Sequence, residues 1–194
     1  MAQQGSNNAP QKSKVYTHDI DEQAHNLTQW QQKYDQVSDG RFYGCIEGVN
    51  YNDIHAFKEY TERALRQQCN IAPNSIWLGI PSQSQQSKIN GLDVASNQFM
   101  CRTSSSDFEL ITPEQFDIYG LVIDWHSIEY MAQLQGVTIK NLSSAQSARL
   151  TVSESSLQTA RQIINSMVAC KGFGLKPESQ QDMLSMLALH FLQA

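Results

Sequence analysis

The five histidines are the first residues to test for chemistry, because imidazole binds metal ions and transfers protons near neutral pH. They are His18, His25, His55, His126 and His190. A metal-dependent enzyme built on a small β-barrel needs two histidines at i and i+2 of one strand, since alternate side chains share a face. No His-X-His triplet occurs in the sequence. This argues against a metal-dependent dioxygenase or isomerase, and we predict no metal ligands.

Other catalytic signatures are also missing. The sequence contains no GxSxG, HExxH, P-loop or GxGxxG motif. The triplet Asp124-Trp125-His126 has the Asp-X-His form by which some corrinoid-binding domains present an imidazole to cobalt, but Glu129 stands where those domains have glycine. We interpret Asp124 instead as the N-cap of a helix. The sequence therefore predicts no catalytic residues, no cofactor of its own and no enzyme.

Acidic and aromatic residues in the middle of the chain suggest a ligand site. A carboxylate next to aromatic rings suits an ammonium group, which is attracted to both. Glu59, Glu62 and Glu109, beside Tyr60 or Trp77, have this chemistry if they face one interior. The alternative is that the carboxylates lie on solvated strand edges and the aromatic rings pack in a core. We take Trp77, Tyr60, Glu59 and Glu109 as the candidate ligand-binding residues.

The middle of the chain reads as a series of short strands. Runs of aromatic and aliphatic residues alternate with turn-forming clusters such as Asn90-Gly91 and Thr112-Pro113. Many short strands with such punctuation favour an antiparallel barrel or jelly roll. The segment Phe57–Gln68 also contains good helix formers, so a helix there is an alternative. The predicted strands are Arg41–Gly48, Asp53–Glu62, Ala64–Ile71, Ser75–Ile80, Gln98–Thr103, Asp107–Ile111 and Phe116–Asp124.

The N-terminal region divides into a tail and a helix. Residues 1–16 are polar and predict a disordered tail. Leu27, Trp30, Tyr34 and Val37 then recur at helical spacing, and Asn26 is well placed to cap that helix. Such an aromatic stripe is more typical of a core face than of a ligand cage. We therefore expect an N-terminal helix that precedes the strands.

The chain becomes helical after Asp124, where we expect a short helix over Trp125–Gly136. The Thr151–Glu154 segment has the form of a capping box. It precedes a helix predicted over Ser153–Lys171, and Pro177 opens another over Pro177–Gln193. The apolar stripes of these two helices exceed what a small barrel needs, which suggests that they pair two subunits. The predicted dimerisation residues are Leu157, Ile164, Met167, Leu184, Leu187 and Phe191.

Length, charge and hydropathy limit the class of protein. The chain has 194 residues, enough for one domain or for one domain with a short appendage. Its formal net charge is -5, without the basic excess of a dominant nucleic-acid surface. No apolar stretch reaches the length of about 20 residues that a transmembrane helix needs, and the polar N-terminus does not read as a secretion signal. We expect a cytoplasmic protein that makes no membrane contact and does not grip DNA by itself.

Three segments carry a resemblance to a known family. They are LTQWQQKYDQVSDGRFYG (Leu27–Gly44), FKEYTERALRQQCNIAPNSIWLGIP (Phe57–Pro81) and DFELITPEQFDIYGLVI (Asp107–Ile123). They resemble the N-terminal region of AraC/XylS-type transcription regulators, most of all those of ethanolamine-utilisation operons. The likeness runs from about Tyr16 to Asp124. It implies a cupin-like barrel that holds a small effector, helices that pair two subunits, and a C-terminal domain with two helix-turn-helix units that bind DNA.

These observations combine into one prediction. The fold is α+β, a cupin-like antiparallel β-barrel (jelly roll) followed by a pair of amphipathic α-helices. Residues 17–124 form the effector-binding barrel with its N-terminal helix, and residues 125–194 form a helical dimerisation region that stops before the DNA-binding domain. We expect a homodimeric regulatory domain that responds to ethanolamine or a related small polar metabolite. By resemblance alone, adenosylcobalamin is a further candidate effector. A stand-alone cupin-like metal-dependent enzyme and a ligand-free interaction module remain alternatives.

Overall fold

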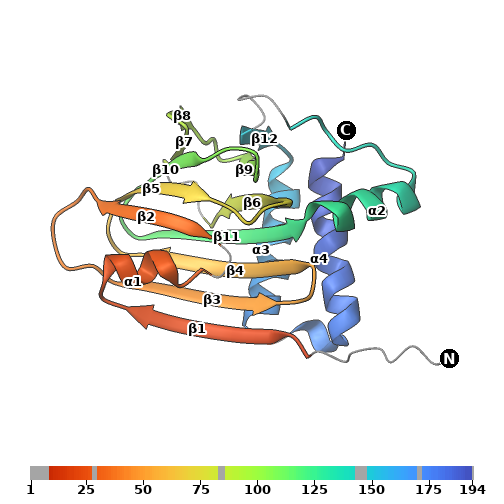
Figure 1. Ribbon diagram of the computed structural model, residues 1–194, viewed down its shortest axis with the longest axis horizontal. Coiled ribbons are helices and arrows are strands. Elements are labelled where there is room, and N and C mark those ends of the chain that lie inside the picture. Colours follow the sequence, from red (N-terminus) through yellow and green to blue (C-terminus); the bar gives the residue numbers. More distant parts are fainter. Residues whose placement is uncertain (1–8, 28–29, 83–85, 143–147, 170–171, 194) are drawn as a thin grey trace.

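The computed structural model describes residues 9–27, 30–82, 86–142, 148–169 and 172–193. It is a mixed α+β structure, in which the described residues form two antiparallel β-sheets and four α-helices (Figure 1). Their strand pairs fall into two separate sheets rather than into one continuous ring. The α+β class and the antiparallel pairing are thus as predicted, while the described pairing does not close a barrel.

The larger sheet has seven strands and forms the centre of the molecule. Its middle strands are buried on both faces, so they read as continuous apolar runs instead of alternating ones; every residue of Ser75–Pro81 is buried. In order across the sheet, its strands are β1 (Gln11–Thr17), β3 (Gly44–Asn50), β4 (Ile54–Thr61), β11 (Phe116–Asp124), β6 (Ser75–Pro81), β9 (Gln98–Thr103) and β12 (Arg149–Thr151).

The smaller sheet has five strands, three of them long enough to cover the first sheet. In order, they are β2 (Gln31–Gln36), β5 (Leu65–Asn70), β10 (Phe108–Thr112), β7 (Lys88–Ile89) and β8 (Leu92–Asp93). All seven predicted strands are confirmed within a few residues. The segment Phe57–Gln68 is the end of β4, a turn and the start of β5, and not a helix.

The helices cover the ends and one face of the larger sheet. They are α1 (Ile20–His25), α2 (Trp125–Gln135), α3 (Glu154–Val168) and α4 (Pro177–Leu192). Figure 1 shows α3 and α4 crossing the strands of this sheet. As predicted, the Asp124 side chain caps α2, accepting from Ser127 N at 2.9 Å, and Pro177 begins α4. No helix among the described residues is long and apolar enough to cross a bilayer.

Two large hydrophobic cores lie on the two faces of the larger sheet, and a smaller third cluster joins Ala24, Tyr34, Phe42 and Leu65. The helix-side core joins outward residues of β4, β6 and β11, such as Leu78 and Leu121, to α3 and α4. The inter-sheet core lies between the two sheets and contains residues of both, such as Phe57 and Trp77 from the larger sheet and Phe108 from the smaller. The candidate site described below is in the inter-sheet core.

The predicted N-terminal helix is wrong. Asn26 ends a helix rather than beginning one, because α1 is capped by Asp19, whose side chain accepts from the first backbone amides. The segment with Trp30 and Tyr34 leads into and forms β2. Residues i and i+4 share a face in a strand as well as in a helix, so this pair of aromatic residues fits both periods. Residues 28 and 29 of the predicted helix lie outside the described ranges.

Two local predictions in the terminal regions also need correction. The predicted tail contains an edge strand, since Gln11–Thr17 pairs with β3 along its whole length; residues 1–8 lie outside the described ranges. The capping-box prediction is wrong because Thr151 ends β12, and Ser153 caps α3 by accepting from Ser156 N at 3.1 Å. The segment after Asp124 is not a unit of its own, since β12 belongs to the larger sheet and the helices share its core.

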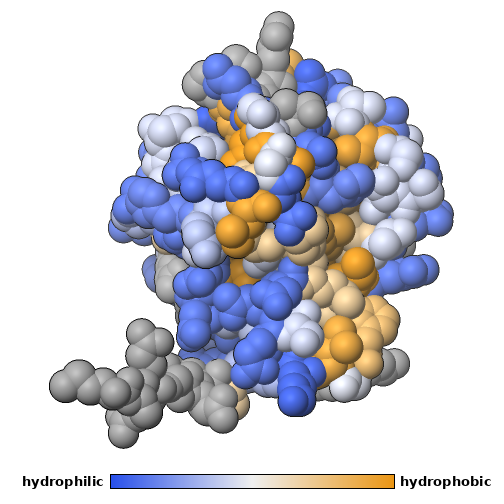
Figure 2. All heavy atoms as spheres, turned by 90° about the vertical axis from the view of Figure 1, so that its right-hand side faces the viewer, coloured by the Kyte–Doolittle hydropathy of each residue, from blue (hydrophilic) through white to orange (hydrophobic). Residues whose placement is uncertain are grey.

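The predicted dimerisation residues are used inside one chain. All six are buried in the helix-side core, where five of them are fully buried and Leu187 is 8% exposed. The apolar faces of α3 and α4 pack against the larger sheet, so these side chains are not available to a second subunit in this conformation. Figure 2 shows the side of the molecule on which α2 and α4 lie, where apolar patches are interspersed with polar side chains. The large apolar residues exposed on these helices are Tyr130, Leu134 and Met186.

Candidate functional site

Two rows of inward-facing side chains meet in the inter-sheet core. Phe57 and Glu59 alternate along β4 with residues that face the helices, and both point toward the smaller sheet. Across from them, Trp30 lies just before β2 and Tyr34 lies in its middle, and both contact the larger sheet. Trp30 meets Phe57 edge to face with ring centroids 6.0 Å apart, and Tyr34 is hydrogen-bonded to Glu59. The site therefore has an aromatic part and a polar part.

The aromatic part consists of four rings in mutual contact. The Trp30 ring lies edge-on to the Trp77 ring at 5.6 Å and to the Phe108 ring at 6.2 Å. The Trp77 and Phe108 rings are stacked at 5.1 Å with an interplanar angle of 18°. Phe57 completes the group through its contact with Trp30. Rings in such arrangements present electron-rich faces, which attract cations.

Glycines beneath the rings let them lie close to the sheet. A Cβ atom on Gly120 would come within 2.1 Å of Cζ of Phe57, and one on Gly79 within 2.2 Å of Cζ2 of Trp77. Such distances are far below van der Waals contact, so neither position tolerates a side chain with these rings in place. The glycines thus set how deeply the two rings sink toward the larger sheet.

The polar part is centred on the carboxyl group of Glu59, which is only 4% exposed. Its Oε1 accepts from Gln23 Nε2 at 2.9 Å and from the Tyr34 hydroxyl at 3.0 Å. Burial raises the pKa of Glu59 to about 7, although both hydrogen bonds oppose the rise. Burial also raises the pKa of Tyr34 well above its usual range, so that hydroxyl stays protonated. Glu59 can therefore gain or lose a proton near neutral pH.

The hydrogen-bond pattern changes with the protonation of Glu59. The Tyr34 hydroxyl has one hydrogen but lies within bonding distance of two acceptors, Glu59 Oε1 and Gln32 Oε1 at 3.1 Å. When Glu59 is protonated it can donate to Tyr34, which is then free to donate to Gln32. When Glu59 is ionised, the two acceptors compete for one proton. A positively charged group nearby would favour the ionised form.

Several buried polar atoms of the site have no hydrogen-bond partner among the described residues. The indole nitrogens of Trp30 and Trp77 are two of them, and both are donors. The carbonyl oxygen of the Gln23 side chain is a third, and it is an acceptor. Buried polar groups are nearly always paired, so unpaired groups of this kind indicate bound water or a ligand. A molecule with both acceptor and donor groups has the chemistry to pair with them.

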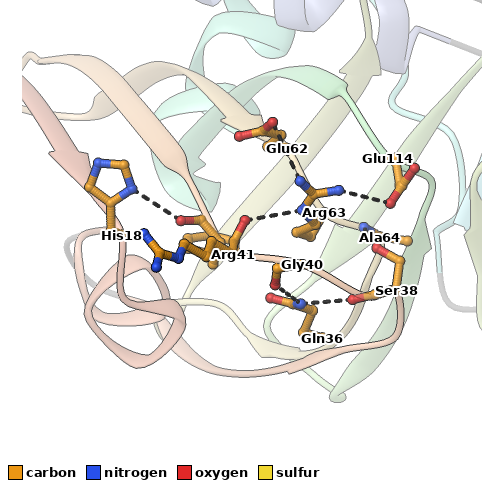
Figure 3. A network of polar contacts seen from close by, with 10 residues as sticks. His18, Gln36, Ser38, Gly40, Arg41, Glu62, Arg63, Ala64 and Glu114 are labelled. Atoms are coloured by element: carbon orange, nitrogen blue, oxygen red, sulfur yellow. Dashed lines mark hydrogen bonds and ion pairs between the residues drawn. The ribbon is translucent and has the colours of Figure 1, made fainter.

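One end of the inter-sheet space is closed by a polar network (Figure 3). Arg63, in the turn between β4 and β5, donates to the Arg41 carbonyl at 3.0 Å and pairs with Glu114 at 3.2 Å and Glu62 at 3.6 Å. Gln36, the last residue of β2, donates to the backbone carbonyls of residues 38 and 40 in the adjacent loop. These contacts connect the ends of four strands and seal this end.

The opposite end carries a pocket with a volume of about 340 Å³. We call it the turn pocket, because the β3–β4 turn forms one wall. His55 is shared with the inter-sheet core, since its ring lies 5.5 Å from that of Phe57. Burial lowers the pKa of His55 to about 4, so the imidazole is neutral at neutral pH. The polar residues that line the turn pocket are Asn50, Asn52, Asp53, His55, Ser75 and Asp124.

The structure brings together two of the four predicted ligand-binding residues. Glu59 and Trp77 both face the inter-sheet space. Tyr60 does not, because it follows Glu59 on the strand and therefore points to the other face, where its ring lies 6.0 Å from that of Tyr43. Glu109 also faces outward and pairs with Arg66 at 2.6 Å. Neither of these two residues therefore belongs to the inter-sheet site.

Sequence reasoning missed the other members of the site. Gln23, Tyr34, Phe57 and Phe108 were not among the predicted ligand-binding residues, and Trp30 was assigned to a helix. Their signal was the alternation of large side chains at i and i+2, as in Phe57 with Glu59, which identifies the inward face of a strand. No group of three His, Cys, Asp or Glu side chains that could hold a metal ion occurs within the described ranges.

Comparisons with known proteins identify the fold. No family model matches the sequence. The solved structure of CuxR, an AraC-like transcriptional activator, aligns with 94% of this chain and 72% of its own, at 12% identity and a TM-score of 0.59. At this identity the likeness shows a shared fold. A mutant of the oxalate decarboxylase of Bacillus subtilis aligns with 54% of this chain and 37% of its own, at 14% identity. Its TM-score of 0.22 is too low to carry an argument.

Proposed function

We propose that this chain is the effector-sensing domain of an AraC-type transcription regulator, with the effector bound in the inter-sheet core. The observation that carries the proposal is the set of unpaired buried polar atoms in the inter-sheet core, one of them on Gln23, which contacts Glu59. A domain built for stability alone would have paired or removed them, because each costs about 1–3 kcal/mol. The fold shared with an AraC-like activator supports the same conclusion.

The chemistry of the site favours a small molecule with an amine and a hydroxyl group. Ionised Glu59 and the faces of the aromatic rings attract an ammonium group. The indole N–H groups of Trp30 and Trp77 are matched by a hydroxyl oxygen, and the Gln23 carbonyl accepts from either ligand group. Ethanolamine has this composition, which agrees with the family resemblance. Adenosylcobalamin remains a separate candidate that rests on the resemblance only.

Strand β6 offers a direct physical connection from the site to the helices. Trp77 points into the inter-sheet core, while its neighbours Ile76 and Leu78 point into the helix-side core. A ligand that moves the Trp77 ring therefore acts on the surface against which α3 and α4 pack. Effector binding shifts the balance between helix arrangements only if the ligand prefers one of them.

The regulator would act as a homodimer that contacts DNA through a separate helix-turn-helix domain of the AraC type. The negative net charge of this chain is consistent with DNA contact through a separate domain. Sedimentation velocity tests the dimer directly. We expect dimers at high micromolar concentration, and a monomer under those conditions would contradict this part of the proposal.

Thermal-shift measurements test the effector. We expect ethanolamine and related amino alcohols to raise the melting temperature, since a ligand at 100 times its dissociation constant adds about 2.7 kcal/mol of stability. Glu59→Gln keeps an acceptor for Gln23 and Tyr34 but removes the charge, so it should abolish the shift. Adenosylcobalamin is tested in parallel.

Matched controls separate the site from the surface. Glu109→Gln removes an outward carboxylate and should leave the shift unchanged. Trp77→Phe keeps a ring but removes one unpaired donor, and it should weaken binding about tenfold. If no amino alcohol and no cobalamin changes the melting temperature of the unmodified protein, the proposed effectors are wrong. If Glu109→Gln removes the shift as fully as Glu59→Gln does, the proposed site is wrong.

A further inference from the structure

The turn pocket ends where the inter-sheet core begins. His55 and Val122 belong to its lining and also form the last inward layer of the larger sheet, where they lie opposite each other in register. Val122 is opposite Trp77 in the neighbouring pair of strands. A single layer of side chains therefore separates the turn pocket from the rings of the candidate site.

His55 occupies that position. Its ring contacts the Phe57 ring, and its Nε2 lies over Gly48, where a Cβ atom would come within 2.9 Å. Toward the other end of the same strand, Thr61 is the corresponding inward residue and is 1% exposed. The Arg63 network lies beyond it and seals that end. The two ends of the inward face of β4 thus differ in access.

The lining of the turn pocket is also selective in charge. It includes the carboxylates of Asp53 and Asp124 and, within the described part of the chain, no Lys or Arg. Both carboxylates already have partners, since Asp124 caps α2 and Asp53 accepts from Gln181 at 3.5 Å. They nevertheless give the pocket a negative potential, which raises the local concentration of cations and lowers that of anions.

We infer that the turn pocket is the entrance to the inter-sheet site, and that His55 is the residue that selects which molecules pass. The entrance admits small neutral and cationic molecules and excludes anions. This inference rests on the proposed function for its biological meaning, but it concerns access alone and does not depend on the identity of the effector.

Fluorescence quenching measures this access with defined probes. The chain has three tryptophans, and Trp125→Phe leaves Trp30 and Trp77, which both belong to the site. In this background, acrylamide is the neutral quencher, caesium the cation and iodide the anion. We expect His55→Ala to raise the quenching constants of acrylamide and caesium about twofold or more, because opening the entrance removes a barrier to local access. The larger ring of His55→Trp would add a fluorophore, so His55→Phe serves as the blocking variant and should lower both constants.

Two controls make the result specific. Thr61→Ala trims the same face of the same strand at the sealed end and should leave all three constants unchanged. Asp53→Asn with Asp124→Asn removes the charge while keeping the hydrogen-bond acceptors, and asparagine is also a good N-cap. This pair should remove the difference between caesium and iodide. Iodide quenching that rises together with the other constants identifies a variant that has unfolded, and circular dichroism checks this independently.

Equal increases of the quenching constants in His55→Ala and Thr61→Ala would contradict the inference that the turn pocket is the entrance. Equal quenching by caesium and iodide in a folded protein would overturn the charge selection. The outcome is separable from that of the thermal-shift test. Quenchers can reach the rings through His55 even if no amino alcohol binds, and an amino alcohol can bind even if quenchers enter elsewhere.

Discussion

The two faces of the larger sheet differ in what they enclose, although the same strands supply both. The helix-side face packs aliphatic and aromatic residues against α3 and α4, and most of its members are fully buried. The inter-sheet face encloses the hydrogen-bonded carboxyl group of Glu59. It also encloses two indole nitrogens and a side-chain carbonyl that have no partner among the described residues. Burying such groups costs free energy, whereas burying apolar groups gains it. The first face stabilises the molecule, and the second is the one to which we assign the proposed effector site.

The two faces of the larger sheet differ in how well the sequence of their strands identifies them. Strand β6 has seven buried residues and no polar side chain between Ile76 and Pro81, so its pattern alone does not distinguish the two faces. The carboxyl, hydroxyl and amide groups of the inter-sheet core come from β4, β2 and α1, in which buried residues are mixed with more exposed ones. The inward polar residues are therefore recognised from elements of mixed burial, and less from a uniformly buried strand such as β6.

The comparison predicts its largest effect on the helix side. Phe191 is fully buried, and its ring lies 4.9 Å from that of Phe99. Phe191→Ala should lower the free energy of unfolding by about 4 kcal/mol, as is typical of large-to-small changes in a core. Urea titration measures this. Met186→Ala on the same helix is the control, because Met186 is 42% exposed and should change stability by less than about 0.5 kcal/mol.

On the inter-sheet side, we predict that Glu59→Gln raises the free energy of unfolding at neutral pH, by a smaller amount than Phe191→Ala lowers it. The pKa of Glu59 is raised from its ordinary value of 4.5 to about 7, so the folded protein binds a proton more tightly than the unfolded chain does. The stability that this provides is fully present below pH 4.5 and is lost as the pH rises through 7. Over that window the loss is about 3 kcal/mol, at 1.36 kcal/mol for each pH unit. The glutamine of the Glu59→Gln variant does not ionise, so that variant does not lose this stability.

Unfolding at several pH values tests this prediction. The free energy of unfolding of Glu59→Gln, relative to the unmodified protein, should rise by about 3 kcal/mol between pH 4.5 and pH 8. Gain of stability together with loss of effector binding would show that the carboxylate is kept for function. A difference that stays constant across this range would mean that Glu59 has no raised pKa, and the contrast between the two faces would be weaker than described.

The smallest effect is expected at the sealed end of the inter-sheet space. Arg63 is partly exposed, with 24% of its side chain accessible, and exposed ion pairs contribute little. Arg63→Ala should lower the free energy of unfolding by about 1 kcal/mol, mostly through the lost hydrogen bond to the Arg41 carbonyl. Thermal shifts by amino alcohols should remain. Loss of the effector response in a folded Arg63→Ala protein would mean that this network takes part in effector binding, contrary to the proposed site.

The sequence predicted elements best where the spacing of apolar residues fits a strand and does not fit a helix. The strands from Ser75 to Pro81 and from Phe116 to Asp124 were predicted because long apolar runs bounded by turn residues fit a doubly buried strand. The strand at Gln31–Gln36 was missed because its aromatic residues are spaced by four, which fits a helix equally well. The strand at Gln11–Thr17 was missed because it is an exposed edge with few apolar residues, held by backbone pairing with β3.

The candidate site was predictable only in part, for a related reason. Glu59 and Trp77 were found from residue type, but residue type does not tell which face of a strand a side chain occupies. Tyr60 and Glu109 were chosen on the same grounds and lie outside. Gln23 enters the site from a short helix that is distant in sequence from β4, and its contact with Glu59 depends on tertiary packing. The same packing places the apolar stripes of α3 and α4 against the larger sheet of their own chain, and their part in dimerisation remains a prediction.

Under the proposed function, the glycines beneath Phe57 and Trp77 affect which ligand the site accepts. Each holds a ring against the sheet without touching any bound molecule. Replacing Gly120 by alanine would lift the Phe57 ring toward the opposite sheet and make the binding space shallower, with every contact residue unchanged. Related receptors can thus differ in the size of the molecule they recognise through a methyl group hidden behind the wall of the site.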